Sequence, residues 1–444
     1  MPPLGGGMEI IMIKKIMVTG LCTLHWGRLQ YGNVGNYYIV EPLFRLLHKY
    51  YPEAEIVTTF QMDENFICRE NINVVPMELY YAWQCDDVGK AEKDVETAKK
   101  YVANNDSVKL TPYLSCIKDA DLIIDVSGDM WGANAEHVGH ERFYVDCLKM
   151  KAAQILNKRT VLYAVTPGPF PIERRDLALE VFSKFDLVVI REKVSFDNLK
   201  KWGFPLDNVV WAPCPSFLFE TDSNYTSKWI DLISQSDSKI IGFTFGGFNM
   251  PVGPYDMWPR ENAQYDVFIK IIEHIINDLD CRICIFSHTN GFELPPHFKL
   301  INGRDFTILS RLYELLIEKN ECYKEKIILI NEPLLPVQLK TIIGKLDMLV
   351  TGRVHASVAA TSQCVPTVFM EYDRRVIYSD KMLGFSQQLG LEDYVCMPGN
   401  YEQIKDCVDR CFFHRQEVRE HLETKMTEIK FEADSIVKDL GHYE

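Results

Sequence analysis

Short apolar runs alternate with amphipathic helical stretches along almost the whole chain, and this pattern constrains the fold more than any other feature. A buried strand, a helix and a second buried strand form the repeating unit of parallel α/β proteins. In the first half, the pattern predicts strands at Lys15–Thr19, Glu55–Thr59, Leu122–Val126, Val161–Val165, Leu187–Ile190 and Val209–Trp211. It predicts helices there at Val40–Lys49, Ala91–Ala103, Arg142–Leu156, Arg174–Lys184 and Lys193–Trp202.

The same alternation restarts after a polar segment, Glu220–Thr226, which predicts a domain boundary. Strands are predicted at Lys239–Thr244, Arg282–Ser287, Ile327–Asn331, Met348–Thr351 and Thr367–Met370, and helices at Asp266–Leu279, Thr307–Ile317, Pro336–Leu346, His355–Ser362 and Ser379–Leu389. We therefore expect an α/β protein of two Rossmann-like domains facing a cleft, the first over residues 8–219 and the second over residues 226–400. Residues 401–444 are expected to form a helical region that packs back toward the first domain.

Composition narrows the classes of partner. A net charge of −14 argues against bulk binding to nucleic acid or anionic lipid, so an anionic substrate requires a locally positive pocket. Thirteen cysteines without a secretory signal indicate reduced thiols in a cytoplasmic protein, and no apolar run is long enough for a transmembrane segment. Cys281 and Cys284 have the spacing of a metal or redox pair, but they lie inside an apolar run and are expected to be buried thiols. No metal site is predicted.

The segment from Lys345 to Tyr372 carries the strongest functional signal, because an arginine and a histidine stand where a strand hands over to a helix. Ligands of parallel sheets bind at the carboxyl ends of the strands, and a helix start there attracts anions. Arg353 has the planar fork that grips phosphate or carboxylate, and His355 exchanges protons near neutral pH. A salt bridge with a helix cap is the simpler alternative for this pair.

Further candidates follow the strands of the first half. Asn33, Gly35 and Asn36 form a turn that would bring the backbone and a helix start close to a ligand, or a plain connection. Pro42 conflicts with a helix capped at Asn36, so the helix either begins at Pro42 or is kinked.

Two more junctions of the first half carry polar groups. Gly128 and Asp129 suit a loop that binds sugar hydroxyls, although Asp129 can equally cap a turn, and His137 is expected in a solvated loop. Arg191 is either an anion clamp or half of a surface pair with the adjacent Glu192.

In the second half, Gly246 ends a strand at the predicted interface, where it either lies against the substrate or turns the chain. His288 follows the next strand and is a ligand contact or a structural histidine. Tyr372 closes a later strand, and Lys381 begins the helix after it, as an anion contact or a solvated lysine.

Together these segments resemble the polysaccharide pyruvyl transferase family, from about Met17 to Leu391. The likeness is strongest from Thr351 to Pro366, with Tyr372 and the run Lys381–Phe385 at the expected distances. The segment Ile190–Ser195 and the turn at Asn33–Asn36 support it.

Two positions depart from the pattern of that family. Asn36 stands where the family usually has an acidic residue, and Cys214 where it often has an aspartate.

The resemblance implies a fold similar to B-type glycosyltransferases and transfer of a pyruvyl group from phosphoenolpyruvate to hydroxyls of a saccharide or lipid-linked saccharide. Arg353, Lys381 and Arg191 would hold the donor anion, and His355 would be the general acid or base. No further cofactor is implied, and self-association into a homo-oligomer stays open. Two alternatives remain: a nucleotide-sugar-dependent glycosyltransferase, in which Glu371 would hold a ribose, and a saccharide-binding protein without turnover.

Overall fold

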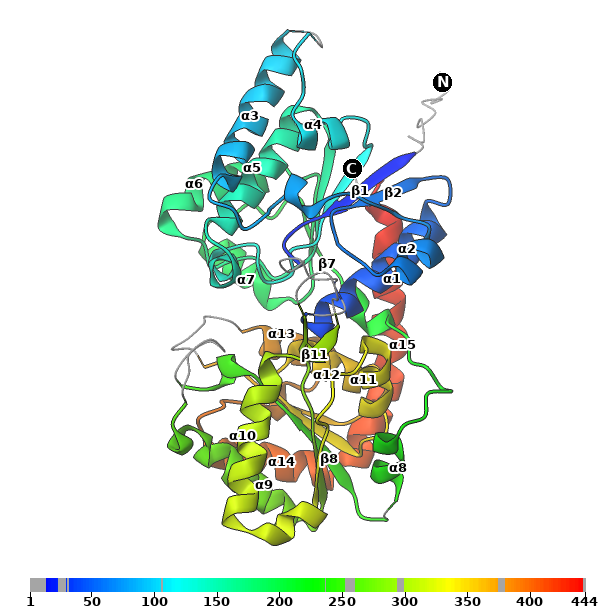
Figure 1. Ribbon diagram of the computed structural model, residues 1–444, viewed down its shortest axis with the longest axis vertical. Coiled ribbons are helices and arrows are strands. Elements are labelled where there is room, and N and C mark those ends of the chain that lie inside the picture. The colour runs from blue at the N-terminus through cyan, green and yellow to red at the C-terminus, as the bar shows by residue number, and fades with distance from the viewer. Residues whose placement is uncertain are drawn as a thin grey trace, which may run out of the picture.

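The computed structural model describes residues 13–22, 29, 32–104, 107–235, 237–251, 260–293, 299–373 and 380–441. Within these ranges the chain forms two parallel sheets, each wrapped in helices and placed one beyond the other along the long axis (Figure 1). The predicted α/β fold class with two Rossmann-like halves is thereby confirmed. Tyr31, which precedes the predicted turn at Asn33–Asn36, and Ser379, which begins a predicted helix, lie outside the described residues.

The first sheet has seven strands in the order β3-β2-β1-β4-β5-β6-β7, and all neighbours are parallel. Its strands are β1 (Lys15–Thr19), β2 (Glu55–Thr58), β3 (Asn73–Val74), β4 (Leu122–Asp125), β5 (Arg159–Val165), β6 (Leu187–Ile190) and β7 (Val209–Trp211). Its helices are α1 (Val34–Tyr50), α2 (Glu64–Glu70), α3 (Asp87–Ala103), α4 (Pro112–Ile117), α5 (Arg142–Ile155), α6 (Arg175–Phe182) and α7 (Val194–Lys201).

The second sheet has six parallel strands in the order β12-β9-β8-β13-β14-β15. Its strands are β8 (Ile240–Thr244), β9 (Arg282–Ile285), β12 (Ile327–Leu329), β13 (Met348–Thr351), β14 (Thr367–Met370) and β15 (Val395–Cys396), and β10 (Asn290–Phe292) with β11 (Leu300–Asn302) forms a separate antiparallel hairpin. The helices are α8 (Lys228–Ser234), α9 (Asp266–Asn277), α10 (Arg304–Lys319), α11 (Pro336–Ile343), α12 (Val354–Thr361), α13 (Lys381–Leu389), α14 (Tyr401–Phe413) and α15 (Arg415–Asp439).

Both sheets follow the strand order of a dinucleotide-binding fold, with the order reversing at β1/β4 in the first and at β8/β13 in the second. The loops that leave the carboxyl ends of strands at such a reversal diverge and open a crevice for ligands. The two crevices lie between the two halves, so the fold itself predicts where a ligand would bind.

The strands are short apolar runs because they are buried on both faces. In β1, Ile16 and Val18 face a core shared with α1 and α15, whereas Met17 faces a second core shared with α3, α4 and α5. Alternate residues of a strand point to opposite faces, so a doubly covered strand must be apolar throughout.

Helix α1 corrects the expectation for the region around Pro42. The helix begins at Val34, and the side chain of Asn33 caps it by accepting a hydrogen bond from the Gly35 N–H at 3.0 Å. Pro42 therefore lies inside the helix, and neither a start at Pro42 nor a cap at Asn36 is correct. Proline removes one backbone hydrogen bond from a helix interior, and here Pro42 is buried against the core.

The C-terminal helical region consists of two helices with different neighbours. Helix α14 stays with the second sheet, where Val408 packs in its core. Helix α15 runs beside α1 into the first half (Figure 1), and Lys49 and Tyr50 both bond Asp434 on α15. Of these two helices, α15 is the one that reaches the first half.

Backbone bonds also join the halves directly. Asn33, at the start of α1, forms a bridge with Thr289, and around it the Asn290 N–H donates to the Gly32 carbonyl at 2.9 Å. The N–H of Val34 donates to the carbonyl of His288 at 3.4 Å. The start of α1 is therefore joined to the second half by backbone hydrogen bonds.

In the part of the chain that the structure describes, no helix has both the length and the apolar character needed to span a bilayer.

Candidate active site

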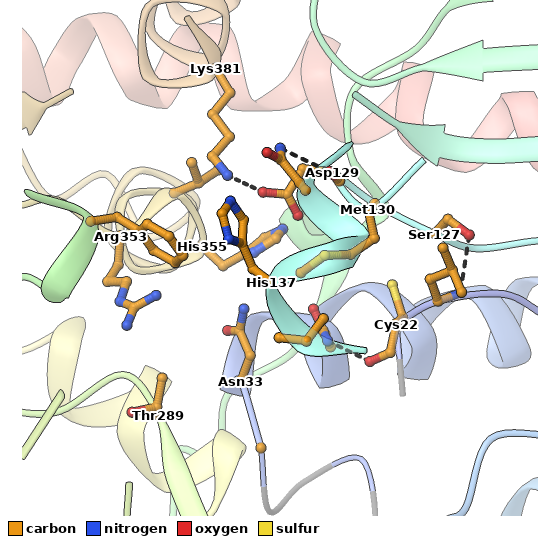
Figure 2. Close-up of a pocket in the computed structure, with 18 of the residues that line it drawn as sticks. Cys22, Asn33, Ser127, Asp129, Met130, His137, Thr289, Arg353, His355 and Lys381 are labelled. Carbon is orange, nitrogen blue, oxygen red and sulfur yellow. Dashed lines mark hydrogen bonds and ion pairs between the residues drawn. The ribbon is translucent and has the colours of Figure 1, made fainter. Parts of the chain in front are cut away.

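A cavity lies between the carboxyl ends of the two sheets. Its walls come from the segments that follow β1, β4 and β6 in the first half and β8, β9, β13 and β14 in the second (Figure 2). Both strand-order reversals therefore contribute to one cavity, as expected for the ligand site of such a fold.

Most of the side chains predicted from the sequence line this cavity: Asn33, Asn36, Gly128, Asp129, Arg191, His288, Arg353, His355, Tyr372 and Lys381. Gly35 and Gly246 do not line it. They lie directly behind two residues that do, because a Cβ at Gly35 would collide with the ring of His355 and a Cβ at Gly246 with the guanidinium of Arg353. These two glycines make room for site residues and are not themselves part of the wall.

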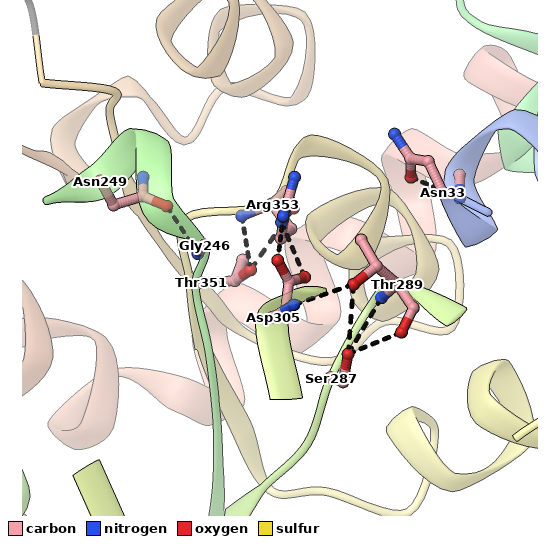
Figure 3. Close-up of polar contacts among 9 residues, drawn as sticks. Asn33, Gly246, Asn249, Ser287, Thr289, Asp305, Thr351 and Arg353 are labelled. Carbon is pink, nitrogen blue, oxygen red and sulfur yellow. Dashed lines mark hydrogen bonds and ion pairs between the residues drawn. The ribbon is translucent and has the colours of Figure 1, made fainter. Parts of the chain in front are cut away.

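Arg353 is held by a carboxylate that the sequence analysis did not single out. Its Nε donates to Asp305 Oδ2 at 2.9 Å, and Nη2 pairs with Oδ1, so the guanidinium and carboxylate meet as two forks (Figure 3). Asp305 is fully buried in the first turn of α10, and its N–H donates to Thr289 Oγ1 at 3.1 Å. The Arg353 backbone N–H donates to Thr351 Oγ1 at 2.9 Å. Arg353 is thus both half of a buried ion pair and part of the cavity wall.

His355, in the first turn of α12, is buried but reaches the cavity with 8% of its surface exposed. The ring of Phe385 stands at 75° to the imidazole, with the centroids 6.4 Å apart. Burial lowers the pKa of His355 well below its usual range, and the Arg191 guanidinium lowers it further. The imidazole is therefore neutral at neutral pH.

Lys381, at the start of α13, forms an ion pair with Asp129 from the other half. Lys381 also lies 4.3 Å above the ring of Tyr372. Burial alone would raise the pKa of Asp129, but Lys381 and Arg191 outweigh it and lower the pKa below its usual value. Asp129 is consequently ionised and can accept hydrogen bonds from hydroxyl groups. Lys381 is buried, so it is not the solvated lysine considered as an alternative.

Arg191 is a buried cation of the cavity wall. Its Nε donates to Thr166 Oγ1 at 2.9 Å, and in the described part of the chain no carboxylate is in salt-bridge contact with it. The surface pair with Glu192 is not formed, because Glu192 is buried and instead accepts from the Ser195 N–H at 2.9 Å. An anion in the cavity would therefore meet an open positive charge at Arg191.

His288 is nearly fully buried, and its ring stands edge-on to Tyr38 at 5.6 Å. Burial, followed by the charge of Arg353, lowers the pKa of His288 to about 3, so it stays neutral. Asn36 donates from Nδ2 to the carbonyl of Cys22 at 2.5 Å and keeps the wall in place.

Sequence reasoning missed several residues of the wall: Cys22, Asn134, Arg142, Phe248, Thr289, Asn290 and Arg304. His137, which was expected in a solvated loop, also lines the cavity, where its ring lies 6.1 Å from that of Phe248. Asn134 and Arg142 come well after the end of β4 in the sequence, and no motif around them indicates that they reach the cavity.

Cys281 and Cys284 are buried free thiols, as predicted. Among the residues that the structure describes, no group of three or more histidine, cysteine and carboxylate side chains has the arrangement of a metal site.

Solved structures define the class of the fold. A putative UDP-N-acetylglucosamine 2-epimerase from Listeria monocytogenes matches with a TM-score of 0.58 and 13% identity over 95% of this chain and 94% of that chain. A glycosyltransferase from Rickettsia africae matches at 0.56 and 11% over 97% and 100%, and MnaA of S. aureus in complex with UDP at 0.55 and 14% over 97% of each chain. At these identities the matches show the fold alone: the chain has the fold of B-type glycosyltransferases, with its cavity between the two halves.

The family follows from the sequence. The chain belongs to the polysaccharide pyruvyl transferase family, whose model matches residues 33–374. The match begins at the cap of α1 and extends past Tyr372. Of the four strands at the two strand-order reversals, it includes β4, β8 and β13 and leaves out β1.

Proposed function

We propose that this protein transfers the pyruvyl group of phosphoenolpyruvate to two hydroxyls of one sugar and forms a cyclic ketal. The observation that carries the proposal is the meeting of a neutral imidazole, His355, with the cations Arg191 and Arg353 around one cavity between the halves. Phosphoenolpyruvate has a phosphate and a carboxylate, and each requires a fixed positive group.

The two arginines are suited to different parts of the donor. Arg353 is held by two bonds to Asp305 and lines the cavity, so its guanidinium could orient an anionic group without moving. Arg191 has an open charge and would supply most of the attraction for the phosphate. Lys381 and Asp129 form a neutral pair on the same wall, and Asp129 would accept a hydrogen bond from an acceptor hydroxyl.

The reaction needs one proton on the methylene carbon of the donor. This leaves a positive centre on the neighbouring carbon, which the first sugar hydroxyl attacks while its proton passes to a base. The bond from that carbon to the phosphate oxygen then breaks, and the second hydroxyl adds. In the overall balance, the two hydroxyl hydrogens become the third hydrogen of the new methyl group and the proton on the released phosphate.

His355 would be the base that takes the hydroxyl proton. Its neutral state at neutral pH suits this role better than that of the acid, and a positioned proton acceptor typically accelerates a reaction by about 10²–10⁴-fold. Burial keeps the ring neutral and the cations around it lower its pKa further, so a multiply negative donor would offset only the effect of the cations.

The glycosyltransferase alternative is weakened at Glu371. Its carboxylate is buried and accepts from the N–H groups of Tyr372 and Leu383, each at 3.1 Å, and it does not line the cavity. Glu371 caps the start of α13, which leaves it poorly placed to hold a ribose.

The test incubates the purified protein with phosphoenolpyruvate, a panel of nucleotide sugars and a panel of saccharides, and identifies the consumed donor by mass spectrometry. We expect phosphate release and a saccharide heavier by one pyruvyl ketal, both lost in His355→Asn. Release of a nucleotide diphosphate would support a glycosyltransferase instead. Saccharide binding that survives His355→Asn, with neither donor consumed by the wild type, would support a binding protein.

A further inference from the structure

The imidazole of His355 meets a thiol that comes from the opposite half of the molecule. Cys214 follows β7 and begins the short 3₁₀ helix Pro215–Leu218, and its Sγ lies 3.9 Å from Nε2 of His355. Cys214 has no exposed surface and does not line the cavity. The sulfur therefore lies behind the ring, on the side away from any bound ligand.

The ring of His355 has two further neighbours. Phe385 packs edge-on against it, and the backbone of Gly35 packs beside Nδ1, so closely that a Cβ there would collide with the ring. Gly35 lies in the first turn of α1, next to the cavity-lining Asn33 and Asn36. With Nε2 turned toward sulfur, Nδ1 is the nitrogen nearest to the start of α1.

We propose that Cys214 is a positioning residue, which holds His355 in the neutral tautomer protonated on Nε2 and leaves the Nδ1 lone pair to accept the hydroxyl proton. A thiol suits this role because its sulfur accepts a weak hydrogen bond and carries no charge. The identity of that proton rests on the proposed pyruvyl transfer, but the tautomer does not.

The alternative is that Cys214 is itself a nucleophile activated by His355. Burial raises the pKa of the Cys214 thiol above its usual value, so the reactive thiolate is suppressed. The sulfur also has no access to the cavity. Both facts favour a thiol that orients the ring over one that attacks a substrate.

The charged groups facing the ring explain why an uncharged partner matters. Arg191, Lys381 and the neighbouring His288 lower the pKa of His355, whereas Asp129 raises it. A carboxylate at position 214 would add a second negative charge directly at Nε2 and stabilise the imidazolium. Because the thiol is uncharged, the pKa of His355 is set by the charges around the cavity, and an anion that binds there can change it.

The experiment measures the tautomer of His355 in the full-length protein by ¹⁵N NMR, with His355→Asn to assign the signal. We expect the wild type to show the Nε2-protonated form at neutral pH. Cys214→Ala should populate both tautomers and lower kcat by about 10–100-fold while the KM for phosphoenolpyruvate changes less than about twofold. Cys214→Ser keeps a hydrogen-bonding group, so it should restore most of the Nε2-protonated population and most of kcat.

Cys214→Asp provides a second measurement. It should raise the pKa of His355 by at least about one unit and shift the acidic limb of the kcat/KM profile upward by the same amount. Cys284→Ala is the matched control, because Cys284 is an equally buried thiol in β9 and lies away from the cavity. It should leave the tautomer and the profile unchanged.

An unchanged tautomer in both Cys214→Ala and Cys214→Asp would overturn the proposal, as would alkylation of Cys214 in the native protein with loss of activity. The NMR measurement requires no turnover. A wild type that ignores phosphoenolpyruvate but shows the expected tautomer would therefore overturn the proposed function and leave the role of Cys214 intact.

Discussion

The two halves of the cavity each bury acidic side chains beside a strand end, yet they treat the charge in opposite ways. In the second half, Asp305 faces Arg353 fork to fork and keeps its charge. In the first half, Asp125 and Asp146 lie side by side without a comparable ion pair. Burial raises the pKa of Asp146 to about 6 and that of Asp125 well above its usual range, so this pair retains a proton.

The difference shows which half supplies fixed charge to a ligand. An ion pair at the wall orients a guanidinium, whereas a protonated acid pair only supports its surroundings. Here Ser127 donates to Asp125 and accepts from the Leu21 N–H at 3.0 Å, and Tyr80 donates to Asp146 at 2.5 Å. The acid pair thus fixes the two loops at the first strand-order reversal without presenting charge to the cavity.

Asp305→Ala tests the charged half and should have the largest effect. It leaves the Arg353 guanidinium buried without its partner, which we expect to destabilise the protein by about 3–5 kcal/mol and to lower kcat/KM by more than about 100-fold. Urea unfolding and initial rates measure the two effects. Asp305→Asn keeps the shape of the side chain, so its stability and kcat/KM should lie between those of the wild type and Asp305→Ala. A wild-type rate in either variant would show that Asp305 is not needed to hold Arg353 in place.

Gly246→Ala separates the orientation of Arg353 from its charge. The backbone at Gly246 is extended with φ of −133°, so alanine adds no backbone strain, but its Cβ would displace the guanidinium. We expect kcat/KM to fall by about 10–100-fold, because small displacements of positioning groups slow reactions strongly. Gly89→Ala in α3 is the control, since a Cβ there meets nothing, and it should leave activity unchanged. Equal activity of both variants would show that orientation is unimportant.

Asp146→Asn tests the protonated half through the pH dependence of stability. An acid whose pKa is raised by folding binds its proton more tightly in the folded state, so stability is highest below the unfolded pKa and falls as pH rises through the folded value near 6. We expect the wild type to lose roughly 1–3 kcal/mol between pH 4 and pH 8, and the variant to lose less. Urea unfolding of both proteins between pH 4 and pH 8 measures this difference. The same pH dependence of stability in both would refute a proton held between Asp125 and Asp146.

Lys90→Ala sets the baseline for an exposed charge pair. Lys90 and Asp86 pair on α3 with about half of each side chain exposed, 50% and 60%. Exposed pairs contribute little, so we expect a change below about 0.5 kcal/mol in urea unfolding and no change in rate. A larger loss of stability would mean that burial does not explain why the variants of Asp305 and Asp146 have larger effects.

Much of the fold was predictable from the sequence because the buried strands are apolar on both faces. The strands missed are the short ones, β3, β15 and the hairpin β10–β11, since two or three residues carry no periodicity. The start of α1 was predicted six residues late, at Val40, because proline is unfavourable inside a helix; at Pro42 tertiary packing overrides that preference.

The site was predictable in part for a different reason. Arg353, His355 and Lys381 follow strands, and the carboxyl ends of parallel strands meet at one edge, so their convergence follows from topology. Asp305 lies 48 positions from Arg353, and only the folded chain brings it to the guanidinium. Cys214 drew attention only as a departure from the family pattern, and its contact with His355 likewise depends on the two halves meeting.

The bridge between Asn33 and Thr289 has a consequence for how such a protein diversifies. Main-chain atoms join the halves at that point, so this contact does not depend on which side chains line the facing walls. Substitutions along the walls can therefore change what the cavity recognises without removing this connection between the halves.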